Sequence, residues 1–412
     1  MPKIIPFKAV KPTRATVGLV ATRPYQSYTV DERESRMAYN PYSFLHVINP
    51  GYKYDQEVKG NKRYELVKNR YLEFKEDGIL VQDEKPSFYV YKIVNRFGQE
   101  FNGIIAASSA EDYENGIIKK HEDTIVKREE TFKNYIQSVG FNAEPVLLTY
   151  PDNAKIAAII KATQNSFAEF EFTTTYRDTH YLWKIDTEDT ITAIKDEFEQ
   201  METVYIADGH HRSASSYLLY KDEKAKNLNH KSSASYNFFM SYLIPESDLV
   251  VYEFNRLIKD LNGASKEEFL ISLDTAYRIE NRGTLPYKPS KPHHFSMYLD
   301  GEFYSLYLRK SAYNFNTALD QLDAQLLYKT ILQPLLGIKD LRHDNRISYV
   351  NGQHEMLTIK SSIDSGEFTV GFGMCPSNIT QIKQIADEGL TMPPKSTYIL
   401  PKLRSAITIY EY

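Results

Sequence analysis

Asp208, Gly209, His210, His211 and Arg212 follow one another in the chain and combine a carboxylate, two imidazoles and a guanidinium. The apolar run before them, 204–207, predicts a buried strand, and residues 213–221 predict a helix. A helix start exposes backbone N–H groups and the positive end of the helix dipole, which together favour an anion. The basic side chains add donors for phosphate oxygens, and the glycine lets the backbone come close.

The segment therefore predicts a phosphate-binding turn that includes Gly209, His210, His211, Arg212 and the following Ser213. The carboxylate of Asp208 can orient an imidazole, hold a metal ion or accept a proton. The alternative is a strand, turn and helix whose polar side chains only face water. We favour function, because two histidines and an arginine directly after Asp-Gly are unusual for an idle surface turn.

Two further segments carry candidate binding residues. The segment 121–124 contains His121, Glu122 and Thr124, but it lacks the second histidine of a zinc protease motif. Its alternative is a solvent-exposed helix end. The proline-rich loop 392–397 presents Lys395, Ser396 and Thr397, and it could hold an anionic ligand at little cost in ordering entropy. Its alternative is a turn before the final strands.

Near the start, Arg23 and Tyr25 follow an apolar run, Val17 to Val20, which we interpret as a strand. Residues after a strand end are favoured positions for binding. Glu32 falls in the first turn of a helix expected over 31–39. Acidic residues at that place are also ordinary partners of the helix dipole.

Composition excludes several classes of protein. The chain has 412 residues and a net charge of −4, so no basic field invites nucleic acid. Its single cysteine, Cys375, excludes an internal disulfide framework. There is no apolar run long enough to span a membrane and no leader-like start, so we expect a cytoplasmic protein. A Walker-type loop, a dinucleotide-binding glycine fingerprint and a protein-kinase signature are also missing.

Strands and helices are mixed without a strict strand–helix–strand rhythm, which predicts an α+β fold. Hairpins are expected at 88–94 with 101–106, and at 295–299 with 303–308 around Asp300-Gly301. Ser265 to Glu268 forms a capping box that predicts a helix start. A boundary near Asn255 divides the expected catalytic region, 1–255, from a C-terminal α+β region, 256–412, packed against it.

Several motifs, spread from Pro6 to the C-terminus, resemble a widespread uncharacterised bacterial family. Its members carry ADGHHR in mid-chain and MPPKSTY followed by PKL near the end. Further landmarks also match. The matching segments are Asn40–Leu45, His121–Thr124, Leu182-Trp183 with Asp186, Ala207–Arg212, Phe254–Arg256, Met392–Tyr398 and Pro401–Leu403.

This family resembles the ParB/sulfiredoxin-like superfamily, and it is similar to free L-serine kinases that share the DGHHR motif. The resemblance implies a ParB-like core and transfer of a phosphoryl group to L-serine, giving O-phospho-L-serine. Pyrophosphate, ADP or ATP would be the donor, and Mg²⁺ would assist. By this resemblance Asp208 is catalytic or metal-linked, and the residues after it, including His211 as a catalytic candidate, bind donor phosphates.

The chain departs from the family at one place. Many members read Pro-Pro-Tyr-Asp-Val after the first strand, whereas this chain has Arg23-Pro-Tyr-Gln-Ser27. The general base is then Asp208 or Glu32, each of which must lie within hydrogen-bond reach of the hydroxyl. A non-catalytic nucleotide- or phosphometabolite-binding module is the alternative function, and a structural turn is the third. We expect a small-molecule substrate, no nucleic acid, no membrane and possible homo-oligomers.

Overall fold

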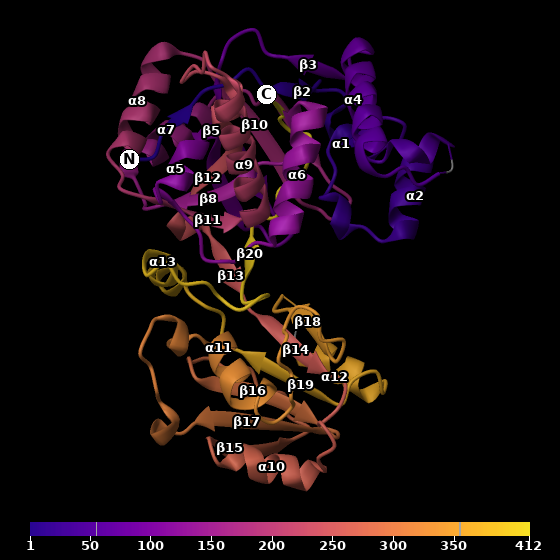
Figure 1. The fold of residues 1–412 in the computed structure, drawn as a ribbon, viewed down its shortest axis with the longest axis vertical. Helices are drawn as coiled ribbons and strands as arrows, with labels where there is room; N and C mark the ends of the chain where they lie inside the picture. The colour runs from indigo at the N-terminus through magenta and orange to yellow at the C-terminus, as the bar shows by residue number, and fades with distance from the viewer. Residues whose placement is uncertain (55, 354–355) are drawn as a thin grey trace. The chain divides into compact units, whose positions relative to one another are not determined.

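The computed structural model describes residues 1–54, 56–353 and 356–412, which form two compact units (Figure 1). The first unit comprises Met1–Lys119, Thr124–Leu249 and Pro401–Tyr412. The second comprises Lys120–Asp123 and Val250–Leu400. The chain therefore leaves the first unit and returns to it with residues 401–412. The assignment of phosphate chemistry to residues 1–255 stays a prediction.

A mixed sheet forms the framework of the first unit. Within the described residues it has nine strands in the order β6-β11-β8-β12-β5-β4-β10-β9, with β1 also paired to β5. Its strands are β1 Ile4–Ile5, β4 Phe88–Val94, β5 Glu100–Ser109, β6 Ile118–Lys119, β8 Val146–Tyr150, β9 Phe170–Thr173, β10 Thr179–Ile185, β11 Val204–Asp208 and β12 Phe238–Pro245. β8 runs parallel to β12 and β6 parallel to β11, while the other pairs are antiparallel.

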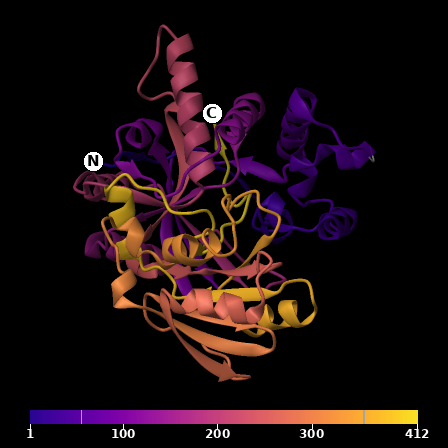
Figure 2. The same ribbon diagram turned by 60° about the horizontal axis from the view of Figure 1, so that its bottom comes forward.

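Helices and short strands complete this unit. The helices are α1 Val17–Val20, α2 Val30–Tyr39, α3 Leu45–Ile48, α4 Gly60–Glu76, α5 Ala110–Glu114, α6 Val126–Val139, α7 Ala154–Gln164, α8 Glu188–Glu199 and α9 His210–Lys226. The short strands are β2 Val10–Pro12, β3 Leu80–Gln82, β7 Phe141–Asn142 and β21 Tyr410–Glu411. In Figure 2, α9 is the long helix whose end leads through the loop 227–237 back to β12. Helices together with a mixed sheet confirm the α+β prediction.

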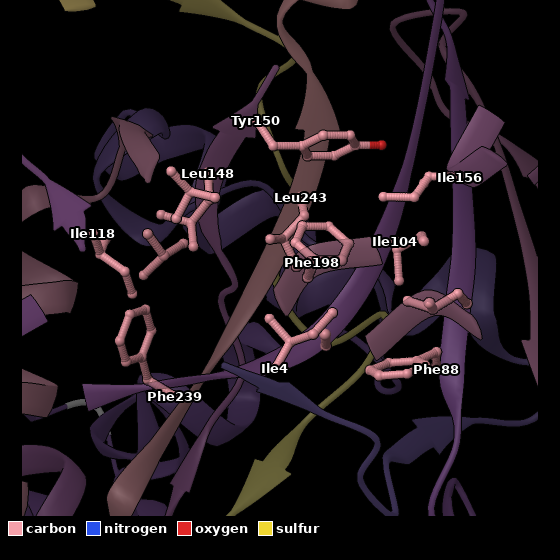
Figure 3. Packing of buried hydrophobic residues seen from close by; sticks show 14 of the residues in the cluster. Ile4, Phe88, Ile104, Ile118, Leu148, Tyr150, Ile156, Phe198, Phe239 and Leu243 are labelled. Carbon is pink, nitrogen blue, oxygen red and sulfur yellow. The ribbon is translucent and has the colours of Figure 1, made fainter. Parts of the chain in front are cut away.

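One hydrophobic cluster of the first unit lies on one face of the sheet. Alternate residues of the strands, such as Phe88, Leu148 and Phe239, point to this face, as period-two side chains must. Ile156 of α7 and Phe198 of α8 pack onto them, and all five side chains are fully buried (Figure 3). Burial of each such side chain stabilises the fold by about 1.5–3 kcal/mol, so the helices are firmly fixed to the sheet.

Local sequence signals predicted several elements correctly. The expected hairpin at 88–94 and 101–106 is β4–β5. The capping box at Ser265 and Glu268 is present at the start of α10. The Asp300-Gly301 turn joins two antiparallel strands as expected.

The prediction of a strand at Val17 to Val20 is wrong, because these residues form the helix α1. Val17 donates its backbone N–H to the Thr13 carbonyl, and Val20 donates to Thr16. Val17 and Val20 are buried while the two residues between them are exposed, which is a helical spacing. Four apolar residues are too few to distinguish the two periods from sequence.

The second unit has its own sheet. Among the described residues it has six antiparallel strands in the order β15-β17-β16-β19-β14-β18, and β13 pairs with β20 beside it. The strands are β13 Val250–Tyr252, β14 Phe254–Ile258, β15 Tyr277–Gly283, β16 His294–Leu299, β17 Glu302–Leu308, β18 Ile347–Asn351, β19 Val370–Met374 and β20 Tyr398–Leu400. The helices are α10 Lys266–Asp274, α11 Asp323–Leu327, α12 Met356–Asp364 and α13 Ile379–Asp387. Ile359 and Ile363 of α12 pack onto the sheet and form its hydrophobic cluster with Leu257, Tyr298 and Phe303.

The returning segment, residues 401–412, is built into the first unit. Tyr410–Glu411 pairs with Phe141–Asn142, and Ile409 exchanges both backbone hydrogen bonds with Val10. Thr22 and Ser405 form a further antiparallel bridge. Two distant parts of the sequence, the first strands and the last residues, are thereby held together.

Candidate functional site

The strand, turn and helix expected around Asp208 are present. β11 is a buried strand that ends at Asp208, and α9 begins at His210, earlier than the predicted start at residue 213. Gly209 between them has φ 101°, a left-handed conformation that glycine adopts without strain. No side chain caps the helix at this position, so the turn presents the positive end of a long helix.

Arg212 folds back over this turn. A Cβ atom added to Gly209 would lie 3.1 Å from both Nε and Nη2 of Arg212, so a glycine is required here for space as well as for conformation. The guanidinium donates to the carbonyl of Pro145, in the loop before β8, and its Nη1 lies 3.6 Å from Oε2 of Glu144. A cation is therefore fixed directly over the start of α9.

Asp208 is held in its ionised form. Burial raises its pKa, but Lys402, Arg212 and His210 outweigh burial and lower the pKa to about 2. The Lys402 ammonium donates to Oδ2 at 3.1 Å, and the Asp208 side chain remains partly exposed. A carboxylate that takes up protons so weakly is a poor general base, but it is a suitable ligand for a hard cation.

The other residues of the turn differ in their surroundings. His210 is buried, and His211 is half-buried on the first turn of α9. Ser213 is fully buried, and its hydroxyl donates to the Gly209 carbonyl at 3.2 Å. This serine is therefore engaged with the helix backbone in the structure.

Sequence reasoning missed Glu144 and did not place Lys402 at this turn. Oε1 of Glu144 accepts a hydrogen bond of 2.7 Å from the Ser405 hydroxyl, and Oε2 of the same carboxylate lies 3.6 Å from Arg212. Lys402 and Ser405 come from the returning segment, nearly two hundred residues after Asp208. The Pro401–Leu403 motif was the available signal, but a motif alone does not tell which residue it contacts.

The early candidates form a group of their own in the first unit. Arg23 Nη2 lies 3.0 Å from Oε2 of Glu32, and Tyr176 donates to the same carboxylate at 3.3 Å. Glu32 also closes a capping box with Thr29, and the backbone hydrogen bond from Thr29 is the main cause that lowers the Glu32 pKa. Tyr25 lies in a short 3₁₀ turn.

Gln26 and Thr124 contact the α6 region. The Gln26 side-chain oxygen accepts a hydrogen bond of 2.9 Å from Arg128. The Thr124 hydroxyl donates to the carboxylate of Glu129. Both side chains are thus held by the first turn of α6.

The remaining candidates belong to the second unit. His121 is fully buried and Glu122 forms a parallel bridge with Met392, so the alternative of a solvent-exposed helix end is wrong. The reason is that the His121 carbonyl accepts from the Met392 N–H at 2.9 Å, which keeps the segment extended. Two motifs that are distant in sequence are brought together in this way.

The proline-rich loop is a turn that leads into β20, as its structural alternative predicted. Lys395 has φ 58°, and its ammonium lies 5.2 Å from the centre of the Phe254 ring. The Ser396 hydroxyl donates to the Pro393 carbonyl at 2.6 Å, and Thr397 precedes the strand. Binding of an anion by Lys395, Ser396 and Thr397 stays a prediction.

Among residues 1–54, 56–353 and 356–412, no group of three or more histidine, cysteine, aspartate or glutamate side chains is placed to hold a metal ion. Mg²⁺ is commonly bound through one or two carboxylates, substrate phosphates and water, which a single Asp208 fits. The described residues also contain no helix long and apolar enough to cross a membrane.

A family model described as a protein of unknown function, DUF1015, matches residues 4–325. The chain belongs to the DUF1015 family. No curated protein matches the sequence.

Similar solved structures include a variant of free serine kinase in complex with AMP. That structure has a TM-score of 0.38 and 11% identity, covering 74% of this chain and 92% of the other. A C-terminally truncated SbnI from Staphylococcus aureus has a TM-score of 0.36 and 12% identity, covering 74% and 87%. A conserved hypothetical protein from Pyrococcus furiosus has a TM-score of 0.33 and 11% identity, covering 74% and 95%.

Proposed function

We propose that this DUF1015 member is a cytoplasmic small-molecule kinase with a ParB-like core. It transfers a phosphoryl group to the hydroxyl of free L-serine and gives O-phospho-L-serine, with pyrophosphate, ADP or ATP as donor. The observation that carries this proposal is the cationic turn at the start of α9, where Arg212 covers Gly209 beside an ionised Asp208. The motif resemblance of the whole chain to free serine kinases supports the choice of acceptor.

Phosphoryl transfer depends mainly on positioning and on neutralising charge at the transferred group. The N–H groups at the start of α9, together with Arg212, His210 and His211, supply that neutralisation. Asp208 would hold Mg²⁺, which neutralises charge on the donor oxygens when bound. The serine oxygen forms the new bond to phosphorus while the bond to the leaving phosphate breaks.

The serine hydroxyl must also lose its proton. Asp208 and Glu32 are the proposed acceptors, and both have lowered pKa values. A weak base suffices where the transition state is loose, because little proton transfer is needed before the donor bond breaks. Asp208 is better suited to the metal ion, which leaves Glu32 for the proton.

Turnover by the purified full chain tests the proposal. The protein is incubated with Mg²⁺, L-serine and pyrophosphate, ADP or ATP in turn, and O-phospho-L-serine is followed by phosphorus NMR. We expect product with at least one donor. Light scattering on the same sample tests for homo-oligomers.

Arg212→Ala should lower turnover by about 100- to 1,000-fold, because it removes a fixed donor to the transferred group. Arg212→Lys keeps the positive charge but loses the guanidinium that donates to the Pro145 carbonyl. It therefore separates the effect of the charge on turnover from the effect of this contact. Arg14→Ala removes an exposed arginine of the same unit and is the matched control. Full activity of Arg212→Ala, or unfolding of both Arg212 variants, would refute the assigned role.

A non-catalytic nucleotide- or phosphometabolite-binding module is the second candidate. Gln26 favours it, because an amide bound by Arg128 stands where many relatives carry an acid. Binding of pyrophosphate or ADP by calorimetry without any phosphoserine would support the module and exclude the kinase.

A further inference from the structure

The bridge between Thr22 and Ser405 connects the early region with the phosphate turn. Thr22 N–H donates to the Ser405 carbonyl at 3.2 Å, and Ser405 N–H donates back at 2.8 Å. Opposite residues of an antiparallel pair point to the same face. On that face the Ser405 hydroxyl contacts Glu144, whose carboxylate also faces Arg212.

Two arginines flank this bridge. In an antiparallel pair the residue after one partner lies beside the residue before the other, so Arg23 lies beside Arg404. Both guanidinium groups are close to Tyr28, since Arg23 stacks on its ring and Tyr28 acts electrostatically on Arg404. Like charges placed opposite each other are unfavourable unless an anion lies between them.

Arg404 is fixed by neutral groups. Its Nε donates to Nε2 of His180 at 3.2 Å, and His180 Nδ1 lies 2.7 Å from the Tyr91 hydroxyl. All three side chains are buried. Burial, followed by the charge of Arg404, lowers the pKa of His180 well below its usual value, so this imidazole adds no charge.

The terminal nitrogens of Arg404 make no hydrogen bond with any described residue. On the other side, Arg23 stacks on Tyr28 and Tyr176 at 4.2 and 4.6 Å. Its Nε is buried and also has no hydrogen-bond partner among the described residues. The Arg23 Nε is thus a buried donor of the kind that is costly unless something binds it.

Positive charge exceeds negative charge around Tyr28. Arg36 also lies over this ring, at 5.5 Å, and donates to the Thr175 hydroxyl. Of the three guanidinium groups, only that of Arg23 has an ion pair within the described residues, with Glu32. Asp178 acts on Arg404 at longer range, without a hydrogen bond to it.

We propose that Arg23 and Arg404 form a clamp for an oxyanion, which is the α-carboxylate of the amino-acid acceptor. This assignment rests on the proposed kinase function. Two guanidinium forks match the planar geometry of a carboxylate, whereas the start of α9 already provides for the donor phosphates.

Calorimetric binding to the full chain tests the clamp without turnover. The probes are L-serine, L-serinamide (whose carboxylate is replaced by an amide) and pyrophosphate. We expect Arg404→Met to weaken L-serine binding by about 10- to 100-fold, the effect of losing hydrogen bonds between charged groups. L-Serinamide should bind the variant and the wild type equally.

Arg404→Lys keeps the charge without the planar fork and serves if the methionine variant does not fold. Arg33→Met is the matched control, because Arg33 lies over Tyr25 outside the clamp. If pyrophosphate binding falls instead of L-serine binding, the clamp holds a donor phosphate. If no probe binds the wild type, or if both Arg404 variants bind as Arg33→Met does, the clamp is refuted.

Failure of the kinase proposal gives a different result. Suppose that Arg404→Met loses affinity for L-serine while the wild type forms no phosphoserine. That result would exclude the kinase but leave the clamp. Normal phosphoserine formation and normal L-serine affinity in the Arg404 variants would exclude the clamp but leave the kinase.

Discussion

Asp208 and Lys402 form the most informative residue pair at the turn between β11 and α9. Lys402, together with Arg212 and His210, lowers the pKa of this partly exposed carboxylate to about 2. Because the folded pKa lies below the unfolded value of about 3.9, their interaction with Asp208 stabilises the fold above about pH 4. The stabilisation is lost as the pH falls from there towards 2.

Lys402→Met should change how activity depends on pH. Without the ammonium, burial is less fully opposed and the Asp208 pKa rises from its low value. We expect the acid limb of kcat/KM in the variant to lie at a higher pH than in the wild type. Rates measured from pH 4 to 8 check this.

Lys155→Met is the control, since the exposed Lys155 pairs with the carboxylate of Glu197 in the same unit. It removes an ammonium that contacts a carboxylate, but far from this turn in sequence. An equal acid limb in the wild type and in Lys402→Met would show that Lys402 does not set the protonation of Asp208.

At the scale of elements, the junction of β11 and α9 depends on one glycine. Gly209→Ala should destabilise the fold by about 1–2 kcal/mol, because its φ of 101° is unfavourable for a residue with a Cβ. The new methyl group would also displace Arg212, so pyrophosphate affinity should fall by about 10-fold. Thermal unfolding and calorimetry measure the two effects.

Gly140→Ala provides the comparison. Gly140 has φ 80° at the end of α6, and a Cβ there would meet nothing within 4 Å. It should therefore lose similar stability but keep its affinity for pyrophosphate. Equal affinities in the two variants would show that Arg212 does not need the space above Gly209.

Elements with local signals could be predicted from the sequence. The Asp300-Gly301 hairpin and the Ser265 capping box follow from turn and cap chemistry within a few residues. Helix α1 was mistaken for a strand, because four residues carry too little periodicity. Short-range rules therefore predict the hairpin and the capped helix without any knowledge of the tertiary fold, but they do not predict α1.

The residues of the candidate site that are neighbours in the chain could be predicted in the same way. Asp208 to Arg212 are neighbours in the chain, so strand, glycine and helix start together indicate their chemistry. Glu144 and Lys402 could not be placed, because each reaches the turn through tertiary pairing rather than through spacing. A single sequence contains no measure of such long-range contacts.

At the scale of the whole molecule, the returning segment, residues 401–412, belongs to the first unit. Its buried residues should therefore stabilise the first unit and not the second. Ile409 is fully buried in the first unit, and Ile359 is fully buried in the second. Ile409→Ala should remove about 2–5 kcal/mol of stability, and hydrogen exchange should increase within residues 1–249. Residues 250–400 should keep their protection.

Ile359→Ala is the matched control, since it makes the same change at an equally buried site. It should increase exchange in residues 250–400 and leave the first unit protected. Equal loss of protection across both units in either variant would show that the chain unfolds as one cooperative body.

The same returning segment also sets the order in which the protein can mature on the ribosome. Lys402 and Arg404 are synthesised only after all of Val250–Leu400. At typical elongation rates, the nascent first unit waits roughly 10–30 s for these two cations. During that time Asp208 and Arg23 are already present without Lys402 and Arg404, so an unfinished chain cannot complete either of the two proposed anion sites.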